Sequence, residues 1–141
     1  MDYQVYISTP KETPESAALK TELHLTKGRV LGGWIYFPYG PAGVLHFQLF
    51  RGDEQIAPSN RGASYNLDDA VIPLSLDFEL EEPPYLLFAK TWNTSTSYAH
   101  ALNLALFLRE PEKTKPKGNS PLEKRAAELI AGVKRKNGGL S

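Results

Sequence analysis

The chain has 141 residues, with 16 Lys and Arg against 16 Asp and Glu, and it contains no cysteine. A chain without cysteine has no disulfide, no thiolate zinc site and no cysteine nucleophile. Its charge is divided unevenly, since residues 1–108 carry seven basic and twelve acidic side chains and residues 109–141 carry nine basic and four acidic ones. The basic tail is therefore expected to meet an acidic surface, unless its charge serves only to keep it soluble.

Alternation of apolar and polar residues predicts a series of short strands separated by polar turns. In the first half of the chain, the predicted strands cover residues 3–7, 19–26, 29–37, 42–51 and 54–57. The stretch 32–51 is the richest in aromatic residues, and it consists of two long apolar strands joined by a Pro/Gly turn. Its large apolar side chains are assigned to the core: Trp34, Ile35, Leu45, Phe47 and Leu49.

In the second half, strands are predicted over residues 70–74, 76–80, 85–92 and 98–108. Pro73 places the first of these at an edge or a bend of a sheet, and residues 93–96 are interpreted as a hairpin turn. Eight or nine short strands, with no helical pattern before residue 120, indicate an antiparallel sandwich or barrel. We expect an all-β fold, a jelly-roll-like β-sandwich of about eight strands over residues 1–108.

The C-terminal residues have a different pattern. A Pro/Lys/Glu-rich linker is predicted over residues 109–119, an amphipathic helix over 120–137 and a short tail over 138–141. Ser120 and Glu123 form a capping box at the start of the helix. A lone helix of this length is marginal in water, so we expect it to dock on its own β domain, on another copy or on a different protein.

No pattern for catalysis or for a metal appears in the sequence. His24, His46 and His100 lack metal-ligand spacing, and the sequence has no nucleophile elbow and no phosphate-binding loop. The paired acids at 53–54 and 68–69 have no diagnostic calcium spacing. We therefore predict no catalytic residue, no cofactor and no metal site.

The acids Asp77, Glu79 and Glu81 alternate along one strand. We expect them on its outer face, where they blunt an edge or meet a basic partner.

A protein partner is the expected ligand. Tyr39 lies between prolines at the tip of a turn, and an exposed aromatic on a stiff turn suits an interface anchor. The basic tail lacks interleaved aromatics, so a protein explains its apolar stripe better than a nucleic acid does. No secretory signal and no membrane span is expected. The candidate partner-binding residues are Tyr39, Pro41, Leu122, Arg125, Leu129, Ile130, Val133, Lys134 and Arg135.

The segments 37–46, 58–60, 71–73, 82–85, 92–93 and 97–100 carry a resemblance. Within residues 20–108 the chain resembles small all-β structural proteins of tailed bacteriophages and prophage-like elements. The resemblance implies a virion component assembled in the host cytoplasm, such as a capsid-decorating or head–tail protein, without enzyme activity. Its partners would be other copies of itself, in a homo-oligomer, or a capsid or other virion protein.

Two other hypotheses stay open. The first is a carbohydrate-binding β-sandwich module that uses exposed aromatics. The second is a hydrolase with a carboxylate pair drawn from Asp68, Asp69 and Glu79.

Overall fold

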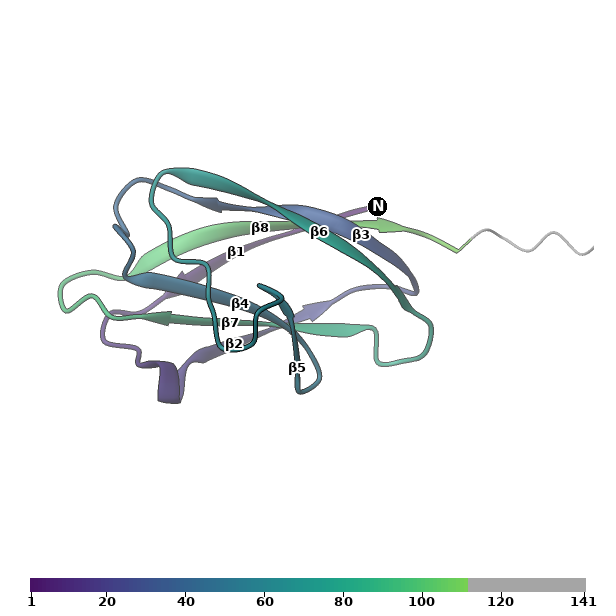
Figure 1. The fold of residues 1–141 in the computed structure, drawn as a ribbon, viewed down its shortest axis with the longest axis horizontal. Helices are drawn as coiled ribbons and strands as arrows, with labels where there is room; N and C mark the ends of the chain where they lie inside the picture. The colour runs from purple at the N-terminus through teal and green to yellow at the C-terminus, as the bar shows by residue number, and fades with distance from the viewer. Residues whose placement is uncertain (112–141) are drawn as a thin grey trace, which may run out of the picture. The chain divides into compact units, whose positions relative to one another are not determined.

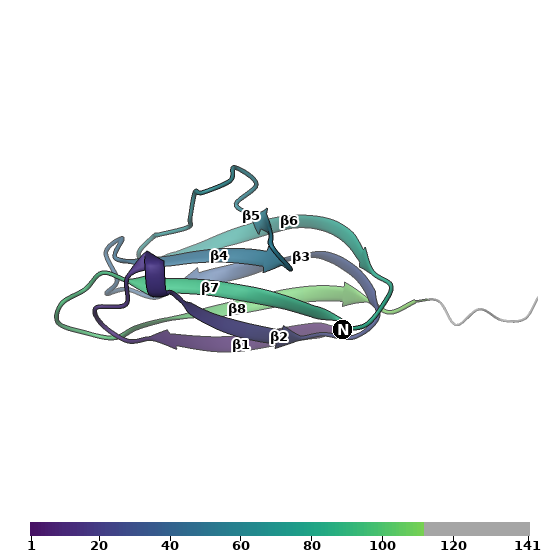
Figure 2. The ribbon, with the colours of Figure 1, turned by 90° about the horizontal axis from the view of Figure 1, so that it is seen from below.

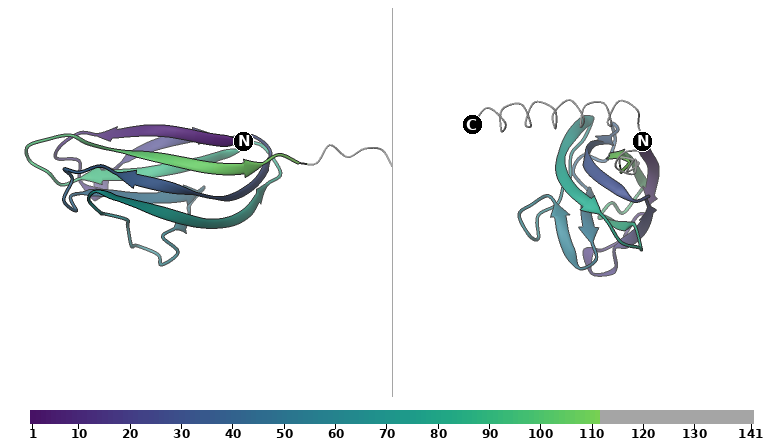
Figure 3. Two further views of the ribbon diagram at one scale, coloured as in Figure 1. Left: turned by 90° about the horizontal axis from the view of Figure 1, so that it is seen from above. Right: turned by 90° about the vertical axis from the view of Figure 1, so that its right-hand side faces the viewer.

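A computed structural model describes residues 1–111 of the protein. Two four-stranded antiparallel sheets pack face to face as a β-sandwich (Figure 1; Figure 3, right). The all-β antiparallel sandwich of eight strands is therefore confirmed. The strands are β1 (Asp2–Thr9), β2 (Leu19–His24), β3 (Gly28–Phe37), β4 (Leu45–Arg51), β5 (Glu54–Ala57), β6 (Ala70–Leu80), β7 (Leu86–Asn93) and β8 (His100–Arg109), with one 3₁₀ turn, η1 (Glu15–Ala17).

The first sheet has the strand order β1-β8-β3-β6 and the second sheet has the order β2-β7-β4-β5. Of the eight described strands, only β4 and β5 are consecutive in the chain and also paired. The hairpin turn predicted at residues 93–96 is wrong, because β7 and β8 lie in different sheets. The Pro/Gly turn at 38–43 likewise carries the chain from the first sheet to the second. Alternation indicates which face of a strand is buried, but it does not indicate which strand becomes its neighbour.

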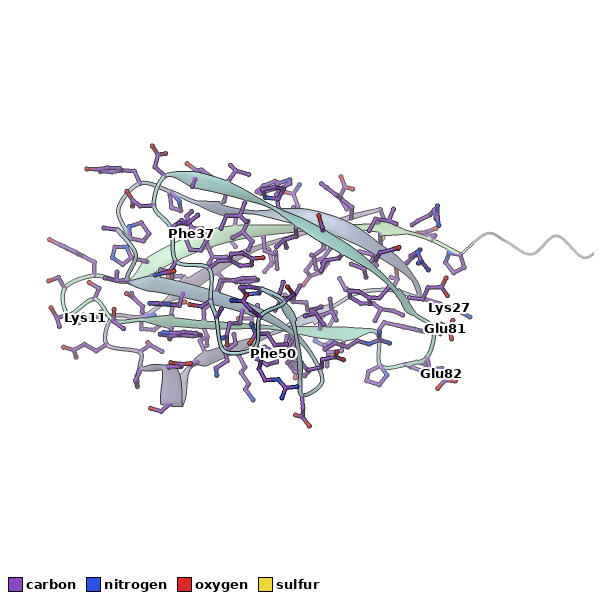
Figure 4. All side chains as sticks on the ribbon, in the orientation of Figure 1. Lys11, Lys27, Phe37, Phe50, Glu81 and Glu82 are labelled. Atoms are coloured by element: carbon purple, nitrogen blue, oxygen red, sulfur yellow. The ribbon has the colours of Figure 1, made fainter. Side chains whose placement is uncertain are left out.

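The core fills the space between the two sheets (Figure 4). Leu45, Phe47 and Leu49 of β4 are fully buried, as predicted, and Ile35 and Phe37 of β3 are buried with them. Burying an aliphatic or aromatic side chain of this size contributes roughly 1.5–3 kcal/mol, so these inner faces are the main source of stability.

Trp34 does not belong to this core, and the prediction for it is wrong. β3 has a bulge at Leu31 against β8, because Val30 and Gly32 lie opposite the consecutive residues Leu108 and Phe107. The register with β6 also shifts at this point, but there the additional residue is on β6. An extra residue reverses the in–out alternation beyond it. Ile35 therefore faces the core, and Trp34 lies on the outer face between Ala105 of β8 and Pro73 of β6.

The two strands predicted on either side of residue 75 are a single strand, β6. Pro73 is tolerated within it because β6 is an edge strand that pairs only with β3, so the missing N–H costs no ladder bond on the free side. The expected edge position of Pro73 is therefore correct.

A buried polar cluster joins the two sheets at one end of the sandwich. Asn93 is fully buried, and its amide nitrogen donates to the carbonyl oxygens of Thr9 (3.1 Å) and Tyr98 (3.0 Å). Its amide oxygen accepts a hydrogen bond from the Ser95 N–H (3.0 Å). The hydroxyls of Thr9 and Thr91 are 2.8 Å apart and hydrogen-bonded to each other.

β8 ends at Arg109, one residue beyond the predicted end of the β domain. The predicted helix at 120–137, the tail at 138–141 and all but the first three residues of the predicted linker lie outside the described residues.

Candidate functional site

The outer face of the first sheet carries an exposed apolar surface. Tyr36, Val71 and Phe107 have exposed fractions of 36%, 60% and 38%. Together with Trp34 and Pro73 they line an open depression of about 520 Å³, and we call this set of five side chains the apolar face.

The strand register explains how the apolar face forms. Trp34 lies next to Ala105 on β8, and Tyr36 lies next to Asn103 on the same strand. The β8 residues next to these two side chains are small, while β3 and β6 supply four of the five side chains of the apolar face and β8 supplies the fifth, Phe107. None of the five side chains of the apolar face carries a charge. A contiguous, uncharged and partly aromatic surface of this kind is typical of a contact with another molecule.

The outer face of the second sheet has a groove of a different character. One cavity of about 270 Å³ and another of about 390 Å³ share Phe50, Asp53 and Lys90 in their walls. Lys20, Gly52 and Phe88 complete the first cavity, and the two cavities together are called the second-sheet groove. Arg61, Glu15, Gln48 and Gln55 line the second cavity.

Hydrogen bonds fix one wall of the second-sheet groove. The Gln48 amide donates to the carbonyl oxygen of Ala63 (2.8 Å), and the Gln55 amide donates to those of Pro58 (2.8 Å) and Ala63 (3.0 Å). The Gln55 amide oxygen accepts from the Gly62 N–H (3.1 Å). The β5–β6 connection, which projects from the β5 side of the sandwich (Figure 2), is therefore held against the sheet.

His46 lies beside this wall. Its ring stacks on Trp92 with centroids 4.8 Å apart and planes 6° from parallel, and its Nδ1 is 2.7 Å from the Ser64 hydroxyl. Burial lowers the pKa of His46 from its ordinary value of 6.5, while Glu15 raises it by a smaller amount. Trp92 is buried through this stacking on the outer side of β7, and it is not part of the core cluster between the sheets.

The lowered pKa of His46 makes stability depend on pH. The unfolded chain takes up a proton on this residue near pH 6.5, whereas the folded chain takes it up only at lower pH. The free energy of unfolding should therefore fall as pH drops below about 6.5, because the unfolded state then binds more protons. In His46→Gln this part of the pH dependence should disappear. Urea titrations of both proteins at several pH values between 5 and 7.5 measure it, and equal slopes in the two proteins would contradict the assignment.

The tip of the 38–43 turn is held by Asp68. One carboxylate oxygen of Asp68 accepts hydrogen bonds from the N–H groups of Gly40 (2.8 Å) and Ala42 (2.9 Å). Tyr39 is 84% exposed, so its predicted exposure is confirmed, whereas Pro41 is buried. The Asp68 oxygen thus serves to shape the loop that presents Tyr39.

The acids of β6 have an internal partner. Arg29 donates from Nε to Asp77 (2.6 Å) and from a terminal nitrogen to Glu79 (2.9 Å). The hydrogen bond to Arg29 holds the pKa of the Asp77 carboxyl below its ordinary value. Arg29 lies opposite Glu79 in the β3–β6 register, so the basic partner of these acids is on the neighbouring strand.

Within residues 1–111, no group of three or more His, Asp or Glu side chains could hold a metal ion. In the same residues, no helix is long and apolar enough to cross a membrane. Seven of the candidate partner-binding residues lie outside this range, so the structure does not bear on them: Leu122, Arg125, Leu129, Ile130, Val133, Lys134 and Arg135.

Sequence reasoning missed both surfaces. The apolar face depends on the β3 bulge, and the groove joins Lys20, Phe50 and Phe88 from three separate strands. The sequence does contain one signal for the groove, since Lys90 is the only charged residue of strand β7. In comparisons with family models, curated proteins and solved structures, no match to this chain was found.

Proposed function

We propose that this protein is a non-enzymatic structural subunit of a viral particle, a capsid-decorating or head–tail component of the phage type. It binds neighbouring subunits through its β domain and through its C-terminal arm. The observation that carries the proposal is the apolar face, an uncharged aromatic surface on the outer side of a sheet. In this proposal the β domain contacts neighbouring subunits through the apolar face.

The pairing of the strands supports a jelly-roll assignment. β1 pairs with β8, β2 with β7, β3 with β6 and β4 with β5. This is the pairing of one long hairpin that has been rolled up into two sheets. Eight-stranded jelly rolls occur in viral capsid and lectin domains, so the fold favours the proposal by analogy alone.

The composition of the apolar face supports a protein contact. Trp34, Tyr36 and Phe107 are the kind of residue enriched at the centres of protein interfaces. Their side chains have few rotatable bonds, so little conformational entropy is lost when a partner covers them. Tyr39 at its turn tip offers a further anchor, and the predicted stripe of Leu122, Leu129, Ile130 and Val133 would supply the contact of the arm.

A charge placed on the apolar face should disrupt assembly. Phe107→Glu and Val71→Glu put a carboxylate into the proposed contact, and an interface residue of this kind contributes about 2 kcal/mol or more, or about 30-fold in Kd. The mass of the native assembly of the full chain, measured by sedimentation at several concentrations, should fall in both variants.

Leu67→Glu is the matched control, because Leu67 is exposed (46%) but does not line the apolar face. It should assemble like the unaltered protein. An unaltered chain that is monomeric at every concentration, with or without the shell protein of its particle, would contradict the proposal. So would Phe107→Glu and Val71→Glu variants that assemble normally.

A further inference from the structure

We propose that the second-sheet groove binds an acidic saccharide, with Phe50 and Phe88 as its stacking platform and Lys20 and Lys90 as the partners of its carboxylate. This site is on the opposite sheet from the apolar face and is separate from the proposed assembly contact. A jelly-roll subunit could therefore hold its neighbours with one sheet and a glycan with the other.

The floor of the groove is aromatic. Phe50 of β4 and Phe88 of β7 are directly opposite each other in the strand register, and both side chains are half-buried (Figure 4 labels Phe50). Half-burial fixes the rings and leaves part of each available to a ligand. The face of an aromatic ring is electron-rich and attracts the weakly positive C–H groups of a sugar ring.

The charges in the groove favour an anionic ligand. Lys20 and Lys90 are directly opposite each other on β2 and β7, and like charges in such a pair repel. Within residues 1–111 neither lysine forms an ion pair, and their shared cavity has Asp53 as its one acid. The Lys90 ammonium lies 5.9 Å from the centroid of the Phe50 ring and 5.6 Å from that of the Trp92 ring, so it is close to the aromatic floor of the groove. A carboxylate between the two ammonium groups would relieve their repulsion and form charge-assisted hydrogen bonds.

The second cavity favours a ligand rich in hydroxyl groups. Glu15 and Asp53 are hydrogen-bond acceptors there, and Arg61 and Lys90 are donors. A hydroxyl group both donates and accepts, so it can use this mixture, whereas a purely apolar ligand would leave these groups unpaired. The two cavities are neighbours that share three side chains, so a ligand with more than one sugar ring can contact both. The hydrogen-bonded wall at 58–63 is formed before a ligand arrives, which lowers the entropy lost on binding.

Isothermal titration of the full chain tests the site with two matched ligand pairs. Tetragalacturonate is compared with its carboxyl-reduced neutral form, and sialyllactose is compared with lactose. At least one of the two acidic saccharides should bind, with an affinity at least about tenfold higher than that of its neutral counterpart. This difference in affinity should decrease at high salt. Lys20→Gln with Lys90→Gln should weaken that binding at least about tenfold, and Phe88→Ala should weaken it for both members of the pair.

The control is Lys11→Gln with Lys27→Gln, because these lysines lie at opposite ends of the sandwich (Figure 4) and removal of the same charge there should change nothing. Amide chemical shifts of the unaltered protein add a readout that does not depend on any variant. They should move in β4 and β7 and not on the apolar face. Absence of binding by both acidic saccharides would overturn the proposal, as would equal affinity for the neutral forms or equal losses in the control variant.

Discussion

Gly33→Ala is expected to lower the free energy of unfolding by at least about 3 kcal/mol. Gly33 is buried in β3, a middle strand of the first sheet, between Leu106 of β8 and Leu74 of β6. A Cβ atom at this position would overlap the carbonyl oxygen of Ala105, which belongs to the backbone of β8. A backbone atom in the middle of a ladder can move only if the neighbouring hydrogen bonds are distorted. Relief of the clash would therefore destabilise the sheet.

Urea unfolding followed by circular dichroism measures this loss. Gly52→Ala is the control, because Gly52 lies in the β4–β5 turn with a φ of +58° and has no atom within 4 Å of an added Cβ. It should cost only about 1 kcal/mol, which is the conformational penalty of a left-handed residue. Equal losses in the two variants would show that conformation, and not the clash with β8, determines the effect.

Asn93→Ala is expected to lower the free energy of unfolding by about 2–4 kcal/mol. The side chain makes three hydrogen bonds to the backbone, and its removal leaves the carbonyl oxygen of Thr9 without that donor in a fully buried environment. An unpaired buried group costs more than the net contribution of the bond that held it. The loss should concentrate at the junction between β1, β7 and the loop before β8.

Asn103→Ala makes the same change at a half-exposed position on the outer face of β8, and it should cost less than about 1 kcal/mol. Hydrogen exchange should show faster exchange near Thr9 and Ser95 in Asn93→Ala and not in Asn103→Ala. If the two variants lose the same stability, the buried cluster does not contribute as the geometry indicates.

The sequence predicts the strands and most of their buried faces because alternation depends only on local spacing. The triplet Leu45, Phe47 and Leu49 follows this rule without interruption. Trp34 does not, because the bulge at Leu31 depends on how β3 fits two neighbouring strands at once. The sequence also does not indicate which strands pair, since turns with similar sequences can either close a hairpin or connect strands of different sheets.

The candidate site was predictable only at Tyr39, whose exposure follows from its neighbouring prolines and glycine. The other surfaces join residues that are distant in the chain, such as Lys20 with Lys90 and Trp34 with Phe107. The sequence predicts a turn at Asn93, because asparagine is typical of turns whether or not its side chain is buried.

The pairing of β1 with β8 has a consequence for the order in which the chain can fold. β1 spans Asp2–Thr9, and its one neighbour, β8, begins at His100. Of the eight described strands, β1 is synthesised first, and its partner β8 is synthesised last. Its inward side chains, Val5 and Ile7 among them, therefore stay without their native strand neighbour until almost the whole sandwich has been made.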